Sequence, residues 1–302
     1  MKPLPVIVGL GEVLWDVFPD GPRFGGAPTN FVCSAVGLGR GQFEVVLASA
    51  VGHDELGQLA LAALNDHQVN IATVARVNYP TGQVDVTLDE HGHASYEFAS
   101  NTSWDHLPWT NEFEKLANRT NVVCFGTLAQ RSDQSQRTIQ QFVASTPPSC
   151  LRLLDINLRS PFWNQDVILQ SLALASALKL NDSELPVIAS FLELRGSDEA
   201  VLAQIMERYS LKVIALTRGA NGSLLLRNSG GCSDLAGQPV NVVDTVGAGD
   251  AFTAALALGV LRSLPLDDIN RWASDVAAFV CTQAGATPRL PATLCLPQET
   301  LQ

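Results

Sequence analysis

Near the carboxyl terminus the chain reads Val242-Val243-Asp244-Thr245-Val246-Gly247-Ala248-Gly249-Asp250-Ala251-Phe252. The β-branched residues at its start predict a strand, the glycines predict a tight turn, and the apolar run 251–261 predicts a helix. A strand that leads through a glycine-rich turn into a helix is typical of an α/β fold. The backbone N–H groups of Gly247, Ala248 and Gly249 would point out of the helix start, where the helix dipole adds partial positive charge, and would form an anion hole.

Asp250 lies directly beside this anion hole. A carboxylate repels the phosphate that the amides attract, unless another group lies between them. A sugar hydroxyl fits there, because Asp250 can take its proton while the amides stabilise the oxygens of the phosphoryl group that it attacks. An aspartate of ordinary pKa is ionised at neutral pH, so we predict that Asp250 is the catalytic base. The alternative is that Asp250 caps the helix beside a simple glycine turn.

Short apolar runs alternate with amphipathic segments along the rest of the chain. The runs are nearly continuous, as expected of parallel strands that are covered by helices on both faces. We therefore predict an α/β fold, a three-layer αβα sandwich with a mostly parallel central sheet, in a single domain 1–302. The predicted strands are 6–10, 45–50, 122–125, 151–155 and 213–217, and further predicted helices are 55–67, 134–144 and 200–209.

Residues 82–98 break this alternation. Val84, Val86 and Leu88 alternate with polar residues up to a predicted turn at His91-Gly92, and apolar residues resume at Tyr96. This is the pattern of a hairpin with one apolar face. We expect it to join residues 12–18 in a small β-sheet lid that could also support a homodimer, and the alternative is a hairpin that extends the central sheet.

Composition excludes several classes of function. With 302 residues, 46% of them hydrophobic, the chain can bury a large core, and its net charge of −11 opposes attraction to nucleic acid. The start of the chain does not resemble a signal peptide, and no run offers the roughly 18 apolar residues of a membrane span, so we expect a cytoplasmic protein without a membrane partner. The six cysteines are scattered without metal-binding spacing and are expected to be reduced thiols.

Other nucleotide-binding motifs do not fit the chain. It has no Gly-Lys pair and therefore no Walker P-loop. A dinucleotide fingerprint would need a third glycine at the position of Phe252 and would open the first βαβ unit, which argues against an NAD-dependent oxidoreductase.

A second motif lies near the amino terminus. Gly9-Leu10-Gly11-Glu12-Val13-Leu14-Trp15-Asp16 is followed by Phe24-Gly25-Gly26-Ala27-Pro28-Thr29-Asn30. Gly25 and Gly26 let backbone approach a ligand closely, while Asp16 and Asn30 offer the acceptors and donors that a polyhydroxylated molecule requires. We predict a sugar pocket here, and the alternative is a glycine turn with Asn30 as a helix cap.

These two motifs resemble the two signatures of the PfkB/ribokinase-like carbohydrate kinase family, and their wording is closest to the fructokinase branch. The resemblance implies a ribokinase-like fold and transfer of the γ-phosphoryl of ATP to a hydroxymethyl group of a free sugar, with fructose as the leading substrate. It implies Asp250 as the base and places Asp16, Gly25, Gly26 and Asn30 on the sugar.

Three further segments resemble elements of the same family. Asn181-Asp182-Ser183-Glu184 is similar to its Asn-x-x-Glu element, which implies that Asn181 and Glu184 organise Mg²⁺ and its waters near the phosphates; a helix cap with a first-turn acid is the alternative. Thr217-Arg218-Gly219-Ala220-Asn221-Gly222 resembles the Thr-x-Gly-x-x-Gly nucleotide loop, with a hairpin turn as the competing interpretation. Gly285 belongs to a segment that resembles the terminal Gly-Ala-x-Pro segment of the family. The resemblance implies that Gly285 lies near the adenine of ATP and near a monovalent cation such as K⁺.

The string Asp155-Ile156-Asn157-Leu158-Arg159, followed by Phe162-Trp163, resembles one shared by fructokinase-like and 2-keto-3-deoxygluconate kinase-like members. The guanidinium of Arg159 is suited to a substrate carboxylate or phosphate, and it could equally be a structural ion-pair partner. 2-Keto-3-deoxygluconate is therefore the second candidate substrate, ahead of ribose or a nucleoside. A catalytically inactive sugar-binding regulator on the same fold is the alternative from another class, and the presence of Asp250 argues against it.

Overall fold

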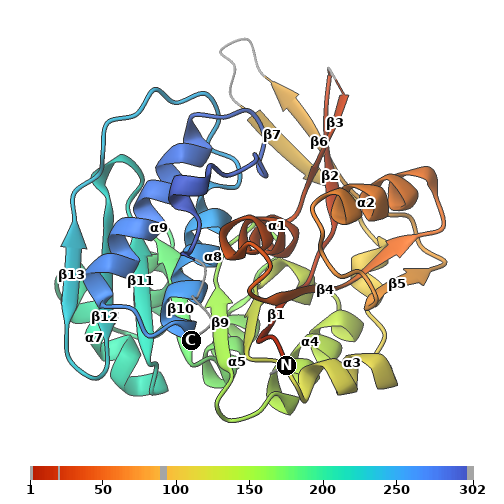
Figure 1. Cartoon of the computed structure of the whole chain (residues 1–302). Coiled ribbons are helices and arrows are strands. Elements are labelled where there is room, and N and C mark those ends of the chain that lie inside the picture. The colour runs from red at the N-terminus through yellow and green to blue at the C-terminus, as the bar shows by residue number, and fades with distance from the viewer. Residues whose placement is uncertain (1–2, 20, 89–93, 298–302) are drawn as a thin grey trace.

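A nine-stranded, mostly parallel sheet runs through the molecule in the order β13-β12-β11-β10-β9-β8-β1-β4-β5 (Figure 1). The computed structural model describes residues 3–19, 21–88 and 94–297. Only β12 and β13 pair antiparallel to their neighbours. The strands are β1 Val6–Leu10, β4 Glu44–Gly52, β5 Val74–Val77, β8 Val122–Phe125, β9 Leu151–Asp155, β10 Ala177–Asn181, β11 Val213–Thr217, β12 Ser223–Arg227 and β13 Cys232–Leu235.

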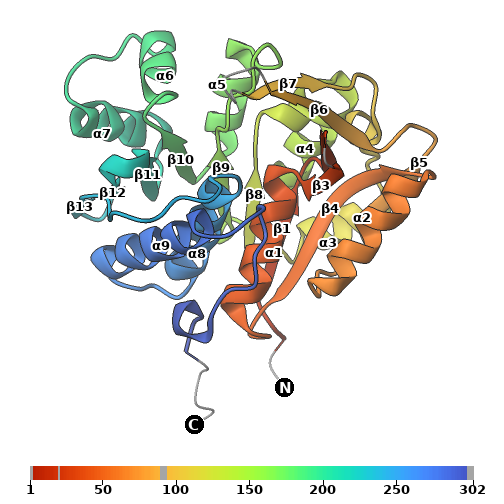
Figure 2. The ribbon, with the colours of Figure 1, turned by 90° about the horizontal axis from the view of Figure 1, so that it is seen from above.

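Helices cover both faces of this sheet, as Figure 2 shows from above. One hydrophobic core lies between the sheet and α3 Asn111–Ala117, α4 Asp133–Ser145, α5 Gln165–Leu174, α6 Leu185–Phe191 and α7 Asp198–Tyr209. A second core lies on the opposite face, against α1 Ala27–Gly39, α2 Glu55–Asp66, α8 Ala248–Leu261 and α9 Leu266–Cys281. Alternate residues of β1 enter the two cores, with Val6 and Val8 in the first and Ile7 in the second. This two-sided burial explains why the strands read as continuous apolar runs.

The predicted αβα sandwich is confirmed, and most boundaries follow from local sequence. Four of the predicted strands end at the predicted residues. The strand 45–50 is longer and spans Glu44–Gly52. Helices α4 and α7 begin one or two residues earlier than predicted because Ser132 and Ser197 cap them, each accepting a hydrogen bond from a backbone N–H group.

The strand predicted at the start of the 242–252 motif is wrong. Residues 242–246 form a loop, in which Val242 and Val243 are 60% and 65% exposed. Helix α8 begins at Ala248 rather than Ala251, because Gly247 in the left-handed conformation starts the helix. The glycine-rich segment is therefore the first turn of the helix and not a turn that precedes it.

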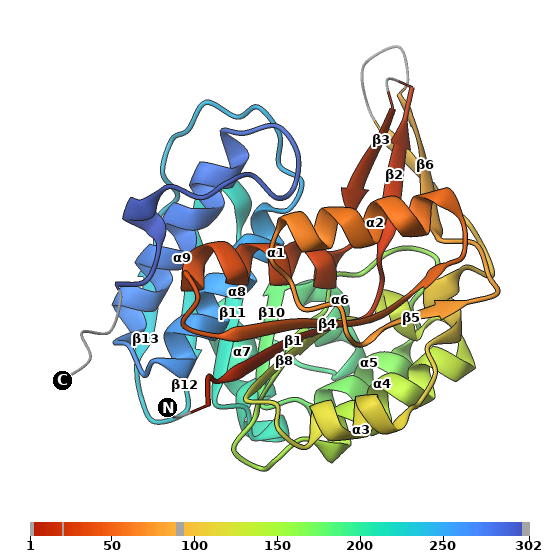
Figure 3. The ribbon, with the colours of Figure 1, turned by 45° about the vertical axis from the view of Figure 1, so that its right-hand side comes forward.

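A separate four-stranded sheet, in the order β3-β2-β6-β7, projects from the body as a lid (Figure 3). Its strands are β2 Leu14–Phe18, β3 Gly21–Gly25, β6 Gly82–Leu88 and β7 Ala94–Phe98. The lid prediction is confirmed, and the alternative in which the hairpin extends the central sheet is wrong. Strand β3 was not predicted, and His91-Gly92 lies outside the described residues.

The two faces of the lid differ in chemistry. Arg23, Asp16, Val84 and Phe98 are partners in register across all four strands and form one row of a single face. On the opposite face Asp85 pairs in register with Glu97, and both are exposed. Two carboxylates directly opposite each other are unfavourable unless water solvates them. Trp15, Val17 and Phe24 share this face with Asp85, so the face carries both apolar and charged side chains. The predicted homodimer stays a prediction.

Among the described residues, no helix combines the length and the apolar character that crossing a membrane requires.

Candidate functional site

A cavity of about 620 Å³ lies between the lid and the carboxyl ends of the parallel strands. This edge of an open α/β sheet is where ligands bind in such folds. The cavity brings together residues that are up to 274 positions apart, from Glu12 to Ala286, including residues of the lid, of the loops after β9, β10 and β11, and of the start of α8. Of the predicted site residues its wall includes Asp16, Gly26, Asn30, Arg159, Asn181, Thr217, Gly247, Gly249, Asp250 and Gly285.

The start of α8 supplies an anion-binding position on this wall. Gly247 has φ of 78°, and a Cβ atom added to it would lie 2.4 Å from the carbonyl oxygen of Ala286, so only glycine fits. The first intrahelical bond runs from the Ala251 N–H group to the Gly247 carbonyl oxygen, at 2.9 Å. Within the described part of the chain, the N–H groups of Gly249 and Asp250 have no hydrogen-bond acceptor. Such unpaired amides at a helix N-terminus are suited to phosphate oxygens.

Asp250 lies in the first turn of α8 and is held by Asn30 of α1. The Asn30 Nδ2 group donates a 2.8 Å hydrogen bond to Asp250 Oδ2. Asn30 is buried, and its Oδ1 atom has no partner among the described residues. An unsatisfied buried acceptor costs free energy, so a ligand hydroxyl that donates to Asn30 Oδ1 would relieve it. The two side chains thus present one acceptor and one base at the same point of the cavity.

Burial raises the pKa of Asp250 to about 6, with a further contribution from the Asp155 carboxylate, while the Asn30 hydrogen bond lowers it. A carboxylate with this pKa is still mostly ionised at neutral pH and is a stronger base than an ordinary aspartate. The environment of Asp250 therefore matches the requirements of a general base.

Two more carboxylates face the lid end of the cavity. Glu12 is 3% exposed and accepts a 3.2 Å hydrogen bond from the Ala27 N–H group, and burial raises its pKa to about 7. Burial raises the pKa of Asp16 to about 6, although the charges of Arg159 and Arg23 oppose this. For both carboxylates the effect of burial therefore outweighs that of the neighbouring cations and N–H donors.

The paired glycines pack tightly below these carboxylates. Gly26 has φ of 108°, and an added Cβ would lie 2.7 Å from the Glu12 carbonyl oxygen. Gly25 is not on the cavity wall, but a Cβ there would lie 3.1 Å from Asp16 Oδ2. Gly26 therefore lets α1 begin next to the ligand position, and Gly25 leaves room for the Asp16 carboxylate.

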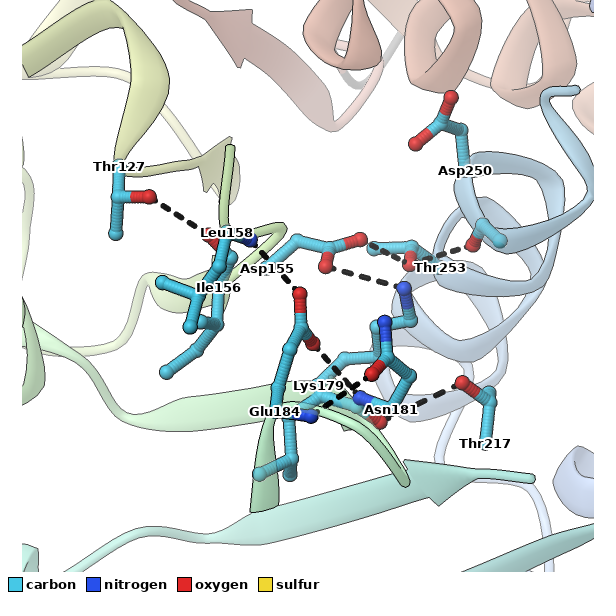
Figure 4. Close-up of polar contacts among 12 residues, drawn as sticks. Thr127, Asp155, Ile156, Leu158, Lys179, Asn181, Glu184, Thr217, Asp250 and Thr253 are labelled. Atoms are coloured by element: carbon cyan, nitrogen blue, oxygen red, sulfur yellow. Dashed lines mark hydrogen bonds and ion pairs between the residues drawn. The ribbon is translucent and has the colours of Figure 1, made fainter. Parts of the chain in front are cut away.

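Glu184 connects two loops below the cavity (Figure 4). Its Oε1 atom accepts from the Leu158 N–H group and its Oε2 atom from the Asn181 N–H group, both at 2.8 Å. Burial raises its pKa, while the nearby Lys179 lowers it. Asn181 lies on the cavity wall and Glu184 behind it, so the side chain of Glu184 fixes the loops on which Asn181 and Leu158 stand.

These residues can accept a magnesium ion only with help from a ligand. Among the described residues, no group of three or more His, Cys, Asp or Glu side chains could hold a metal ion. Mg²⁺ often binds proteins through one or two carboxylates together with waters and substrate phosphates. Glu184 is buried behind the cavity wall and both of its carboxylate oxygens accept backbone N–H groups, so its predicted role toward Mg²⁺ through water remains a proposal.

Only part of the predicted nucleotide loop lies at the cavity. Thr217 ends β11 and lies on the cavity wall, whereas Gly219 and Gly222 form the turn into β12 away from it. Gly222 has φ of 92°, and a Cβ there would lie 1.9 Å from the Leu235 carbonyl oxygen. Packing against β13 therefore accounts for Gly222 without a ligand.

Gly285 is tied to the start of α8 through Asp244. The Gly285 N–H group donates to Asp244 Oδ2 at 3.1 Å, and the Val246 N–H group donates to Asp244 Oδ1 at 3.0 Å. One carboxylate thus joins the loop before α8 to the segment after α9, and both segments line the cavity.

Sequence patterns did not identify Glu12, Lys179 or Thr253 as site residues. A signal was present for Lys179, because a lysine between buried leucines in β10 is rarely buried without a partner. Glu12 stands inside the quoted amino-terminal motif, and its burial is visible only in three dimensions.

The sequence model of the pfkB family carbohydrate kinases matches residues 21–293. The chain belongs to the pfkB family of carbohydrate kinases. This kinase is 31% identical to the fructokinase of Klebsiella pneumoniae, over 93% of this chain and 95% of that protein. The family is one of phosphotransferases, so the alternatives of an oxidoreductase and of an inactive regulator are set aside.

Solved structures show the same fold. The kinase superposes with a TM-score of 0.78 on an uncharacterized sugar kinase from Pyrococcus horikoshii in complex with ATP, at 25% identity over 93% of this chain and 94% of that one. It superposes with a TM-score of 0.80 on the fructokinase of Vibrio cholerae O395 in fructose, ADP and calcium ion bound form, at 23% identity over 96% and 98% of the two chains. The fold is therefore ribokinase-like, as predicted.

The contact between Gly247 and Ala286 generates a test of how the start of α8 is built. Gly247→Ala is expected to lower the free energy of unfolding by about 3 kcal/mol or more, because it adds a backbone clash to left-handed strain of about 1 kcal/mol. It should also weaken ATP binding at least tenfold. Urea unfolding and titration calorimetry measure the two effects.

Gly41→Ala is the matched control, because Gly41 also has φ of 78° and no atom lies within 4 Å of an added Cβ. It should show the strain of about 1 kcal/mol alone, with unchanged ATP binding. Equal effects of the two substitutions on stability and on ATP binding would contradict this account of the helix start.

Proposed function

We propose that this kinase transfers the γ-phosphoryl group of ATP to a hydroxymethyl group of free fructose. The observation that carries the proposal is the position of the Asp250 carboxylate next to the unpaired N–H groups of Gly249 and Asp250, on the wall of a cavity below a lid. The similarity to the Klebsiella pneumoniae fructokinase supports fructose as the sugar. The Pyrococcus horikoshii relative with ATP bound supports ATP as the phosphoryl donor.

The site residues divide the chemistry between them. Asp250 removes the proton of the attacking hydroxyl, and Asn30 holds the Asp250 carboxylate and accepts from the sugar. The amides of Gly247, Gly249 and Asp250 stabilise the charge on the phosphoryl oxygens, whereas the N–H group of Ala248, which the sequence placed in the anion hole, donates to the Thr245 carbonyl oxygen at 3.3 Å. When bound, Mg²⁺ would neutralise phosphate charge, with Glu184 holding its waters.

Binding roles follow from position on the cavity wall. Asp16, Gly26 and Asn30 lie at the lid end and are proposed to bind the sugar. Asn181, Thr217 and Gly285 lie at the opposite end and are proposed to bind the nucleotide. Closure of the lid would exclude water, which would otherwise accept the phosphoryl group.

2-Keto-3-deoxygluconate is the second candidate substrate, and Arg159 is the observation that favours it. Arg159 is exposed at the cavity, and its guanidinium group forms no hydrogen bond or ion pair within the described part of the chain. Its guanidinium could therefore pair with the carboxylate of a sugar acid without breaking an existing contact. Ribose and nucleosides have no charged group for Arg159 and rank lower.

Three smaller proposals accompany this function. The K⁺ site would lie near Gly285, where backbone carbonyls are the expected ligands. A homodimer would form through the lid sheet, and the kinase would act in the cytoplasm on small molecules without a nucleic-acid or membrane partner. None of these changes the roles proposed for Asp250 and Asn30.

The substrate is tested by coupled ADP release with fructose, ribose, 2-keto-3-deoxygluconate, tagatose and a nucleoside. We expect the highest kcat/KM with fructose and less than about a threefold change in that value for Arg159→Ala, because a neutral sugar gives the guanidinium no charge to pair with. A preference for the sugar acid, lost by about 10²-fold in Arg159→Ala, would replace fructose with the second candidate.

The base is tested by Asp250→Asn. Turnover should fall by at least about 10²-fold, the usual scale for losing a general base. Binding of ATP and sugar, measured by calorimetry, should change little, because the amide keeps the shape of the side chain. Asp16→Asn is the control and should raise the sugar KM more than it lowers kcat. Undiminished turnover in Asp250→Asn would overturn the mechanism.

The pKa of Asp250 also sets an expected pH dependence. The base acts in its ionised form, and burial raises its pKa to about 6, so kcat/KM should be level above this pH and fall about tenfold per unit below it. The same profile is expected for Asp16→Asn if Asp250 is the group that titrates. A profile that stays level down to pH 4.5 would contradict the assignment.

A further inference from the structure

Lys179 is a buried cation below the start of α8. It lies in β10 between Leu178 and Leu180, and its side chain is only 7% exposed. Its Nζ atom is 3.1 Å from Asp155 Oδ1, and the Asp155 side chain is 6% exposed. Lys179 nevertheless belongs to the cavity wall. A buried charge that also faces a ligand cavity calls for an explanation beyond packing.

The same ion pair is attached to helix α8 (Figure 4). The Thr253 hydroxyl lies 2.8 Å from Asp155 Oδ2 and 2.8 Å from the Gly249 carbonyl oxygen. A Cβ atom added to Gly249 would lie 3.2 Å from Lys179 Nζ. The ammonium group is therefore directly against the first turn of α8, next to the N–H groups proposed to hold the phosphoryl group.

The charges around this position are unbalanced without it. The described cationic side chains on the cavity wall are Arg23, Arg159 and Lys179. Arg23 and Arg159 lie near Asp16 at the lid end, and their charges lower its pKa. The charge of Arg159 also lowers the pKa of Asp250, but Lys179 lowers it more and is the cation that lies against the first turn of α8. The helix amides there supply only about half a unit charge.

An ammonium group has three N–H donors, and Asp155 accepts from one of them. A purely structural role would be served as well by a pair of apolar residues, because a buried ion pair rarely adds net stability over well-packed apolar side chains. Donors directed at phosphate oxygens would give the buried charge a function.

We propose that Lys179 is a further catalytic residue, whose ammonium group donates hydrogen bonds to the phosphoryl group during transfer, and that Asp155 and Thr253 are positioning residues that hold it there. During transfer the bond between the phosphorus and the ADP oxygen breaks and the bond to the sugar oxygen forms. The hydroxyl proton goes to Asp250, and Lys179 keeps its own. This inference rests on the proposed role of the α8 start.

The test uses the double variant Lys179→Met with Asp155→Asn, which removes both charges of the ion pair together. We expect kcat to fall by about 10²-fold or more, the scale of losing one electrostatic stabiliser of the transition state, with the sugar KM within about threefold of wild type. Lys115→Met, at an exposed position of α3, is the matched control for loss of a lysine charge and should leave both values unchanged.

A binding measurement separates this role from a structural one. ADP with aluminium fluoride and sugar imitates the phosphoryl group in transfer, and its affinity should fall at least tenfold more than the affinity for ADP alone in the double variant. Thr253→Val, nearly isosteric, keeps the ion pair and should lower kcat about tenfold at unchanged sugar KM, so it serves if the double variant does not fold. A folded double variant with normal kcat, or equal losses of the two affinities, would overturn the proposal.

The outcome is distinguishable from a failure of the proposed function. If no sugar of the panel stimulates ADP release by the wild type, the substrate proposal fails. The ATP affinities of the wild type and the double variant can still be compared in that case. The double variant should bind ATP more weakly if Lys179 contacts phosphate. Equal ATP affinity would count against Lys179.

Discussion

The site depends on one steric constraint, the contact of Gly247 with the carbonyl oxygen of Ala286. The left-handed backbone at Gly247 starts α8 at the carboxyl edge of the sheet, with its first N–H groups directed at the cavity. Asp244 stabilises the same arrangement by accepting from Val246 on one side and Gly285 on the other. The segment after α9 fixes where α8 begins, so these two parts of the cavity wall are held together as one unit.

Burial and hydrogen bonding then shift the pKa values of the carboxylates around the cavity. Glu12, Asp16 and Asp250 are carboxylates whose pKa is raised by burial, and each has a donor or a cation nearby that keeps the ionised form accessible. Asn30 has the clearest double role, since its amide group donates to Asp250 while its carbonyl oxygen has no partner among the described residues. In the proposed function a sugar hydroxyl would supply the donor that this acceptor lacks, which would couple sugar binding to the alignment of Asp250 through one side chain.

The sequence was sufficient for the architecture because the strands are buried on both faces. Apolar runs end where burial ends, and the predicted limits of β1, β8, β9 and β11 agree with the structure for that reason. Strand β3 escaped prediction because its Gly21-Pro22 start is typical of a turn, and only pairing with β2 makes it a strand. The wrong strand prediction at 242–246 has the opposite cause. Its β-branched residues favour a strand locally, but no strand in the described part of the chain pairs with them.

The site was harder to predict, because a sequence motif shows which residue types are present but not which side chains come into contact in the fold. The motifs named Asp250, Asn30 and Asp16, and the structure brings all three to one cavity. Glycines of the same motifs turned out to differ: Gly247 and Gly26 lie against the cavity, whereas the conformation of Gly222 is explained by packing on β13. The partnership of Lys179, Asp155 and Thr253 joins three separate elements, so no local pattern could have revealed it.

Under the proposed function, the residues of the reaction and those that select the sugar belong to different parts of the structure. The reacting groups stand on α8 and on the ends of the central strands, which are anchored in the two hydrophobic cores. The lid contributes a row in which Arg23, Asp16 and Phe98 come from three different strands and all reach the cavity. A substitution in that row changes what the lid end of the cavity binds without altering the contacts of Gly247, Asp244 or Asp155. Differences in substrate among kinases of this fold can therefore arise in the lid while the helix start keeps its geometry.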